Sequence, residues 1–179
     1  MHNATLFEEG LDIIPDIVAG DANADLAGDW INLENAGRAY LLLIKPAGTA
    51  GDDLSIHLQQ ATVAAGTDAK DLNFSKLWYK KASATNDFSS TPQWTAVELT
   101  TPTADLDLVS VNGVDLAADT VGAVILVEVR PESLDVNGGF KFVNNIIEGD
   151  DIGNALIVNQ LWILKDCSYP QAVPLTALS

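Results

Sequence analysis

The sequence is poor in the residue types from which reactive centres are built. It contains one cysteine, Cys167, and two histidines, His2 and His57. A single cysteine excludes an intrachain disulfide, and we expect Cys167 to be a small buried apolar side chain. One cysteine and two histidines cannot supply a tetrahedral zinc site. There is also no G-x-G-x-x-G segment, and no lysine precedes a serine or threonine, which excludes the common phosphate-binding loops.

Positive charge is equally scarce. Nine Lys and Arg stand against 25 Asp and Glu, which gives a formal net charge of −16, and the acids are spread over both halves of the chain. Nucleic-acid binding requires Lys and Arg to replace counterions around the phosphates, so we predict no nucleic-acid partner. The same repulsion argues against an anionic membrane surface. No apolar run approaches the ~20 residues of a transmembrane helix, and the first residues lack the pattern of a signal peptide.

What the chain does have is a series of short apolar runs separated by Gly, Asn, Asp and Pro. Leu54–Gln60 alternates cleanly, with Leu54, Ile56 and Leu58 on the inner side. Ala123–Val129 is the most β-branched run and predicts a central strand. Further strands are predicted near 11–14 and at 30–33, 39–45, 74–81, 94–99, 106–111, 140–147 and 155–164. We expect the run at 39–45 to be covered on both faces.

This spacing is typical of an all-β protein, an antiparallel β-sandwich or jelly-roll-like domain, because no long segment has a helical period. We divide the chain into an N-terminal arm over 1–28, a β-sandwich domain over 29–167 and an extended C-terminal tail over 168–179. The arms contain charge-poor apolar stretches, Leu11–Val18 and Ala172–Leu178. Such stretches suit strand addition or groove docking on a neighbouring subunit, with disorder at the chain ends as the alternative.

Ser55 and His57 lie two residues apart on one predicted strand and therefore share a face. A serine nucleophile also needs an oriented carboxylate and an oxyanion hole, and the sequence has no G-x-S-x-G elbow. We interpret His57 as a strand residue on the solvent side. The sequence therefore predicts no catalytic residues, no cofactor-binding residues and a protein that is not an enzyme.

One acidic loop contains residues that could ligate a calcium ion. Its possible ligands are Asp21, Asn23, Asp25 and Asp29. Calcium takes six to eight oxygen ligands, and alternate residues of a loop can deliver them. However, Leu26 occupies the position of the sharp-turn glycine and Asn32 that of the bidentate glutamate. We favour a solvated acidic loop and predict no metal site, without excluding Ca²⁺ at these four residues.

The four tryptophans raise one alternative function. Trp30, Trp78, Trp94 and Trp162 all lie in strand-like runs, where large aromatic residues are usually core or interface. They also have the ring faces on which sugars stack. A carbohydrate-binding module therefore stays open as a second hypothesis, and Trp78 and Trp94 are the residues to mutate.

Three segments resemble a family of tailed-bacteriophage virion proteins, the capsid decoration or cement proteins. The first is LQQATVAAGTDAK at 58–70 with LNFSKLWY at 72–79, the second is VEVRPESLDVNGGF at 127–140, and the third is YPQA at 169–172. The likeness covers most of residues 38–179 in order. Gln59 replaces a glutamate of the family pattern and Asp68 replaces a glycine.

The resemblance implies a protein without a substrate that stabilises the shell of the major capsid protein. It implies a homotrimer of β-sandwich or jelly-roll subunits, made in the host cytoplasm and bound on the outer capsid surface of the virion. Some relatives belong to the tail or neck of the particle, so a tail or neck structural module remains an alternative.

Overall fold

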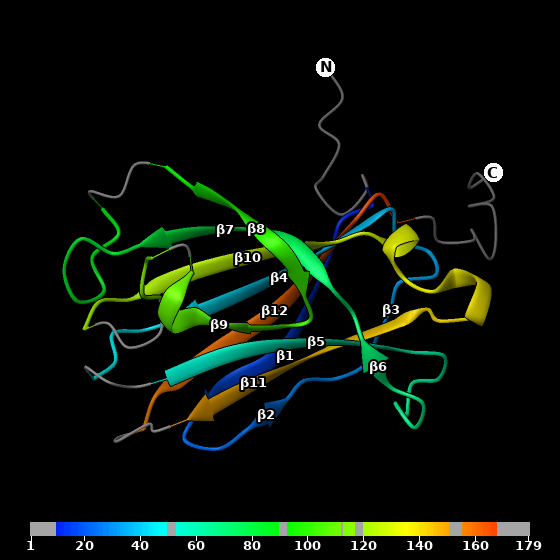
Figure 1. Cartoon of the computed structure of the whole chain (residues 1–179), viewed down its shortest axis with the longest axis horizontal. Helices are drawn as coiled ribbons and strands as arrows, with labels where there is room; N and C mark the ends of the chain where they lie inside the picture. The colour runs from blue at the N-terminus through cyan, green and yellow to red at the C-terminus, as the bar shows by residue number, and fades with distance from the viewer. Residues whose placement is uncertain are drawn as a thin grey trace, which may run out of the picture.

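The computed structural model describes residues 10–49, 53–89, 93–111, 113–116, 120–150 and 155–167. Apart from three short 3₁₀ turns, all the regular structure of these residues is strand, and in this part of the chain every strand pair is antiparallel. The predicted all-β sandwich is confirmed. No helix in the described ranges has the length and apolar character that a membrane crossing demands. Figure 1 shows the strands of both sheets following the long direction of the molecule.

Sheet A has the order β1-β12-β4-β10-β7-β8 within the described residues. Its strands are β1 (Asp12–Asp21), β12 (Ile157–Lys165), β4 (Arg38–Lys45), β10 (Ala123–Val129), β7 (Phe74–Lys81) and β8 (Thr95–Thr103). The β-branched run at Ala123–Val129 is a central strand, as predicted, because it pairs with β4 on one side and β7 on the other.

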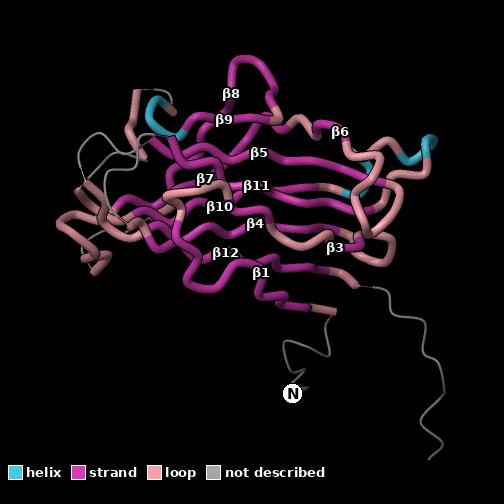
Figure 2. The backbone as a smooth tube through the Cα atoms, turned by 90° about the horizontal axis from the view of Figure 1, so that it is seen from below, coloured by secondary structure: helices cyan, strands magenta, loops and turns pink. Residues whose placement is uncertain are grey.

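Sheet B is built around β11 and β5. Its strands are β2 (Leu26–Ala27), β3 (Ile31–Asn32), β11 (Phe142–Asp150), β5 (Asp53–Ala61), β6 (Lys70–Asp71) and β9 (Asp105–Asp107). The path β2-β11-β5-β6 forms the sheet, while β3 also pairs with β11 and β9 also pairs with β5. The 3₁₀ turns η1 (Leu108–Ser110), η2 (Pro131–Ser133) and η3 (Val136–Gly138) lie at the two ends of the sandwich (Figure 2).

The core fills the space between the sheets with alternate residues of each strand. On β5 the predicted inner residues Leu54, Ile56 and Leu58 are buried, and on β4 the buried residues include Leu41 and Leu43. Strand β4 is not covered on both faces, however. Its outward residues are only half-buried in the described structure. Core packing therefore does not explain why these outward residues are apolar.

The N-terminal segment differs most from the sequence prediction. Instead of an arm with a short strand near 11–14, residues Asp12–Asp21 form β1, which pairs with β12 along the edge of sheet A. Pro15 is accommodated because an edge strand has one side without ladder hydrogen bonds. The stretch Leu11–Val18 therefore pairs within its own domain, where Ile17 is buried and Ile13 and Val18 stay exposed. The predicted tail at 168–179 lies outside the described residues.

Several other boundaries also shift. The predicted strand at 106–111 is instead a short β9 followed by η1, in which Asp107 accepts a hydrogen bond from the Val109 amide. Pro102 does not end its strand, because β8 is an edge strand and continues to Thr103. Residues 30–33 contribute only the two-residue β3. Cys167 has no disulfide and is partly buried against the core.

Candidate functional site

The outer face of sheet A is apolar from one edge of the sheet to the other. Residues directly opposite each other on neighbouring strands form one row, in the order Pro15, Leu161, Leu42, Leu126, Trp78 and Ala96. The adjacent rows add Ile13, Ile163, Tyr40, Ile44 and Val124. We call these eleven residues the apolar face. Because side chains alternate along a strand, none of them belongs to the core between the sheets.

The side chains of the apolar face are half-buried or exposed in the described structure. None of them is fully buried, and Ile13 at the β1 edge is 42% exposed. No third layer of strand or helix stacks on this face among the described elements. Large contiguous apolar patches are uncommon on proteins that work alone and mark binding surfaces.

Trp78 and Trp94 meet at the β8 side of this face. Together with Tyr40 and Leu126 they line an open hollow of about 430 Å³, whose polar members are Arg38 and Glu128. Trp94 is 42% exposed. The Lys80 ammonium lies 5.3 Å from the Trp94 ring centre, and the Lys76 ammonium lies 5.2 Å from the Trp78 ring centre. These are cation–π distances, so each ring has a lysine ammonium close to it.

The apolar face also carries a concentration of the chain's few cations. Arg38, Lys76, Lys80 and Lys165 occupy outward positions of sheet A, whereas the outward acids there are Glu98, Glu128 and, at the end of β1, Asp21. Lys76 pairs with Glu98 at 3.3 Å, and Arg38 lies 3.9 Å from Glu128. A hydrogen bond to Tyr40, with the charge of Glu128 nearby, raises the pKa of Arg38 above its ordinary value. The face is close to neutral or slightly positive in a chain of charge −16.

The outer face of sheet B has the opposite character. Its acidic members are Asp53, Asp71, Asp105, Asp107 and Glu148, and its uncharged polar members include Ser55 and Gln59. We call this set, with His57 at its centre, the acidic face. A hollow of about 200 Å³ lies over part of it and is lined mostly by carboxylates.

His57 is held between two carboxylates. Its Nε2 lies 3.0 Å from Asp71 Oδ1 and its Nδ1 lies 3.3 Å from Glu148 Oε1, with 20% of the side chain exposed. Partial burial on its own lowers the pKa of His57, but the hydrogen bonds and charges of Asp71 and Glu148 outweigh that effect and raise the pKa above 6.5. The predicted solvent-side position is correct, and the ion pairs are an addition that the sequence did not indicate.

This arrangement differs from a nucleophile with its base. Ser55 Oγ donates a hydrogen bond to Glu148 Oε2 at 3.3 Å, so Glu148 stands between the two residues that the strand places on one face. In a serine nucleophile the hydroxyl instead bonds the histidine that removes its proton. The geometry around His57 is that of a charge-paired surface histidine.

The acidic loop of the calcium hypothesis is held by hydrogen bonds between backbone amides and carboxylates. Asp21 Oδ1 accepts hydrogen bonds from the amides of Asn23 and Leu156, at 3.1 and 3.2 Å. The Asp29 amide donates to Asp16, beyond the two-residue strand β2. Within the described ranges, which include all four candidate ligands, no group of three or more Asp, Glu, His or Cys gathers around a common point.

Asp16 is the polar residue that sequence reasoning missed. Its Oδ2 accepts hydrogen bonds from Gln160 Nε2 at 2.5 Å and from Trp162 Nε1 at 3.1 Å, while its Oδ1 accepts the Asp29 amide. Gln160 in turn accepts from Asn145 of sheet B at 2.7 Å. This chain of bonds joins the two sheets inside the sandwich. An apolar stretch interrupted by Pro15 and Asp16 offered no periodic signal for it.

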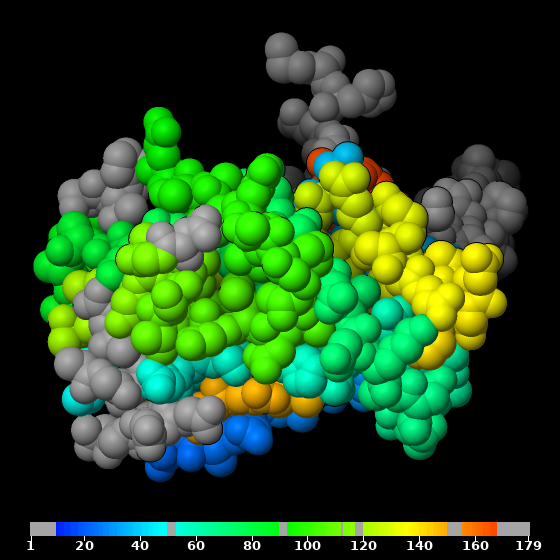
Figure 3. All heavy atoms as spheres, viewed as in Figure 1, coloured from blue at the N-terminus to red at the C-terminus, as the bar shows by residue number. Residues whose placement is uncertain are grey.

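The first two segments that resemble phage proteins meet at one end of the sandwich, side by side in Figure 3. Lys70 lies 2.6 Å from Asp135 and 3.9 Å from the Phe140 ring centre. Gln60 accepts the Asp135 amide and donates to the Asp71 carbonyl. The hydrogen bond with Lys70, and then that with the Gly138 amide, lowers the pKa of Asp135. These residues hold the turns of the fold, and the third segment lies outside the described residues.

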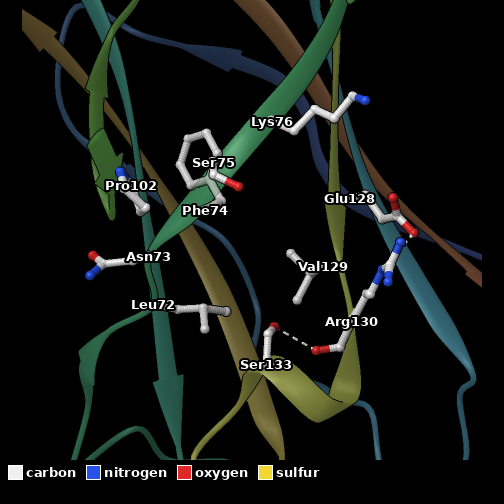
Figure 4. A pocket seen from close by; sticks show the side chains of 10 residues that line it. All are labelled: Leu72, Asn73, Phe74, Ser75, Lys76, Pro102, Glu128, Val129, Arg130 and Ser133. Carbon is white, nitrogen blue, oxygen red and sulfur yellow. Dashed lines mark hydrogen bonds and ion pairs between the residues drawn. The ribbon is translucent and has the colours of Figure 1, made fainter. Parts of the chain in front are cut away.

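Two other hollows lie near this end. One of about 370 Å³ is formed by the start of β7, the end of β10 and η2 (Figure 4), where Glu128 pairs with Arg130 at 3.2 Å and Ser133 bonds the Arg130 carbonyl. The second, of about 610 Å³, is lined mainly by apolar residues around Leu33, Leu134 and Val136. In the lining of this second hollow, Lys141 pairs with Glu34 at 2.9 Å.

Comparison with known proteins adds no relative to this description. No protein-family model, no curated protein and no solved structure matches the chain. The function of the chain therefore has to be inferred from the geometry of its two outer faces.

Proposed function

We propose that this chain is a structural protein of a tailed-phage particle, a capsid decoration protein that binds the shell of the major capsid protein as a homotrimer on the outer surface of the virion. In this proposal it transforms no substrate and uses no cofactor. It works by covering and bridging subunits of the shell.

The contrast between the apolar face and the acidic face is the observation that supports the proposal. A subunit of a particle needs one surface that becomes buried and another that remains solvated. The apolar face spans sheet A with half-buried Leu, Ile and Trp side chains, whereas the acidic face presents carboxylates that keep a particle soluble. The resemblance of residues 58–79 and 127–140 to decoration proteins adds the class of particle.

The test is addition of the purified protein to expanded shells of the cognate major capsid protein. We expect saturable binding at fixed positions of the shell, visible as added density in a low-resolution particle map, and a higher temperature of shell disruption. Shells incubated at the same ionic strength with a folded protein of similar charge are the control. A protein that leaves the shells undecorated at micromolar concentration contradicts the proposal.

The Trp78–Trp94 hollow favours a second candidate, carbohydrate binding by a tail-associated module. Sugar rings stack on exposed aromatic faces, and Arg38 and Glu128 at the rim would hydrogen-bond hydroxyl groups. A glycan array distinguishes the candidates. Saturable binding of a glycan that is lost in both Trp78→Ala and Trp94→Ala, with normal circular dichroism, would replace the decoration proposal. The variant Trp30→Phe, at a tryptophan outside this hollow, serves as the matched control.

A further inference from the structure

We infer that the apolar face of sheet A is the surface through which copies of this chain associate with one another. The inference deepens the proposed function, on whose homotrimer it rests, by assigning the contact between copies to named residues. Contact with the shell then falls to other surfaces of the assembled protein.

The extent of the face suits a protein–protein contact. The outer side of sheet A as a whole, with six strands about 4.8 Å apart and roughly eight residues per strand at about 3.3 Å, spans on the order of 600 Å². A stable interface buries about 800 Å² of accessible surface on each partner, and the accessible surface of a side-chain-covered face exceeds its plane area. The apolar face occupies the central part of this area, and with the charged residues that flank it the contact approaches the size of a standard interface.

Charge makes this face the one against which a second copy fits best. Two molecules that each carry a charge of −16 repel one another over most of their surfaces. The apolar face is where this repulsion is weakest, because Arg38, Lys76, Lys80 and Lys165 offset Glu98 and Glu128. The acidic face of sheet B, with its five carboxylates, is where repulsion between copies is strongest.

Most of the charged side chains that flank the apolar face already have a partner in the same molecule. Glu128 is bonded by Arg130 and lies close to Arg38, and Lys76 pairs with Glu98. Lys80 lies over the Trp94 ring. A buried charge is costly when it loses its partner, whereas these groups bring their partners from the same molecule. The centre of the face, around Leu42 and Leu126, carries no charge and can be desolvated directly.

The test compares one substitution on two faces. Leu126 lies at the centre of the apolar face on β10, and Ile146 lies on the outer face of sheet B on β11, also half-buried. We expect Leu126→Glu to raise the dissociation constant of the homo-oligomer at least tenfold and Ile146→Glu to leave it unchanged. Sedimentation equilibrium over a range of concentrations measures both, and circular dichroism reports folding.

A second variant covers the case in which Leu126→Glu does not fold. Leu126→Thr introduces a β-branched side chain, which suits a strand, and is expected to weaken association by a smaller but measurable factor. A monomeric wild-type protein overturns the inference, as do equal effects of Leu126→Glu and Ile146→Glu.

Shell binding is assayed separately on the same variants. An intact oligomer of Leu126→Glu that no longer binds shells also overturns the inference, while a wild-type oligomer that ignores shells overturns only the proposed function.

Discussion

The outer faces of the two sheets have the same architecture and different chemistry. Both are built from the outward residues of antiparallel strands, but sheet A presents Leu42, Leu126 and Trp78 where sheet B presents Ser55, His57 and Glu148. On sheet B the polar side chains bond to each other across strands. On the described part of sheet A, Tyr40 has a hydrogen bond with Arg38, while the aliphatic side chains of the face have no polar group to pair. The difference indicates which face the sequence prepares for contact.

The largest expected effect separates the core from the apolar face on a single strand. Leu43 and Leu42 are neighbours on β4, but Leu43 is buried between the sheets and Leu42 lies half-buried on the apolar face. Leu43→Ala should lower the free energy of unfolding by about 2–5 kcal/mol, because it leaves a cavity in the core. Leu42→Ala should cost under about 1 kcal/mol in the monomer, since partly exposed residues bury less apolar area.

Urea denaturation at concentrations that keep the protein monomeric measures both free energies. Repeating it at high concentration sharpens the comparison, because Leu42→Ala should then become more destabilising if the face is buried between copies. Similar losses for the two variants in the monomer would mean that the outer side of sheet A is already covered.

A smaller effect is expected at the edge where β1 joins sheet A. Asp16→Ala removes the acceptor of Gln160, Trp162 and the Asp29 amide, and it should lower the free energy of unfolding by about 1–3 kcal/mol because buried donors are left unsatisfied. Asp25→Ala, at an exposed position in the turn after β1, is the control and should change stability by less than about 0.5 kcal/mol.

Thermal unfolding followed by circular dichroism measures the Asp16 and Asp25 variants. Addition of Ca²⁺ in the same experiment examines the loop that contains Asp21, Asn23, Asp25 and Asp29. If a calcium site formed there, the ion would raise the melting temperature of the wild-type protein and Asp25→Ala would abolish that rise.

The smallest expected effect belongs to His57 on the acidic face. Its folded-state pKa is raised, so the stabilisation from its ion pairs is fully present below the unfolded-state pKa of 6.5 and is lost as pH rises through the folded-state pKa. His57→Gln should therefore destabilise the protein at pH 5.5 by at most about 1 kcal/mol and have less effect at pH 8.5.

Proton NMR of the imidazole tests the cause of this pH dependence. Glu148→Gln should bring the pKa of His57 down toward 6.5 by removing one of the two carboxylates, and the substitution Glu98→Gln on sheet A should leave it unchanged. If the pKa of His57 in Glu148→Gln equals that in the wild-type protein, the ion pair between His57 and Glu148 contributes nothing to it in solution.

Some strands could be predicted because their pattern is local. The alternation of Leu54, Ile56 and Leu58 fixes which side of β5 is buried, and a half-buried strand needs no more information than that. Residues 11–21 could not be assigned in this way. They contain Pro15 and Asp16, and they form a strand only because β12 supplies hydrogen bonds from the other end of the chain.

The candidate site was predicted only in its components. Trp78 and Trp94 were identified as residues that could bind a ligand, but nothing in the sequence placed them on one hollow with Tyr40. His57 was expected to face solvent, while its partners Asp71 and Glu148 lie 14 and 91 residues away. Contacts between strands distant in sequence depend on sheet order, which periodicity does not specify.

The sequence by itself determined the all-β class, the inward side of the regular strands and the strongly negative charge. Each of these follows from local alternation or from composition, which need no knowledge of partners. The tertiary structure decided which strands became neighbours, and so it alone created one continuous apolar face and one acidic face. Both depend on register across strands, because a shift by a single residue would have turned each outward side chain into the core.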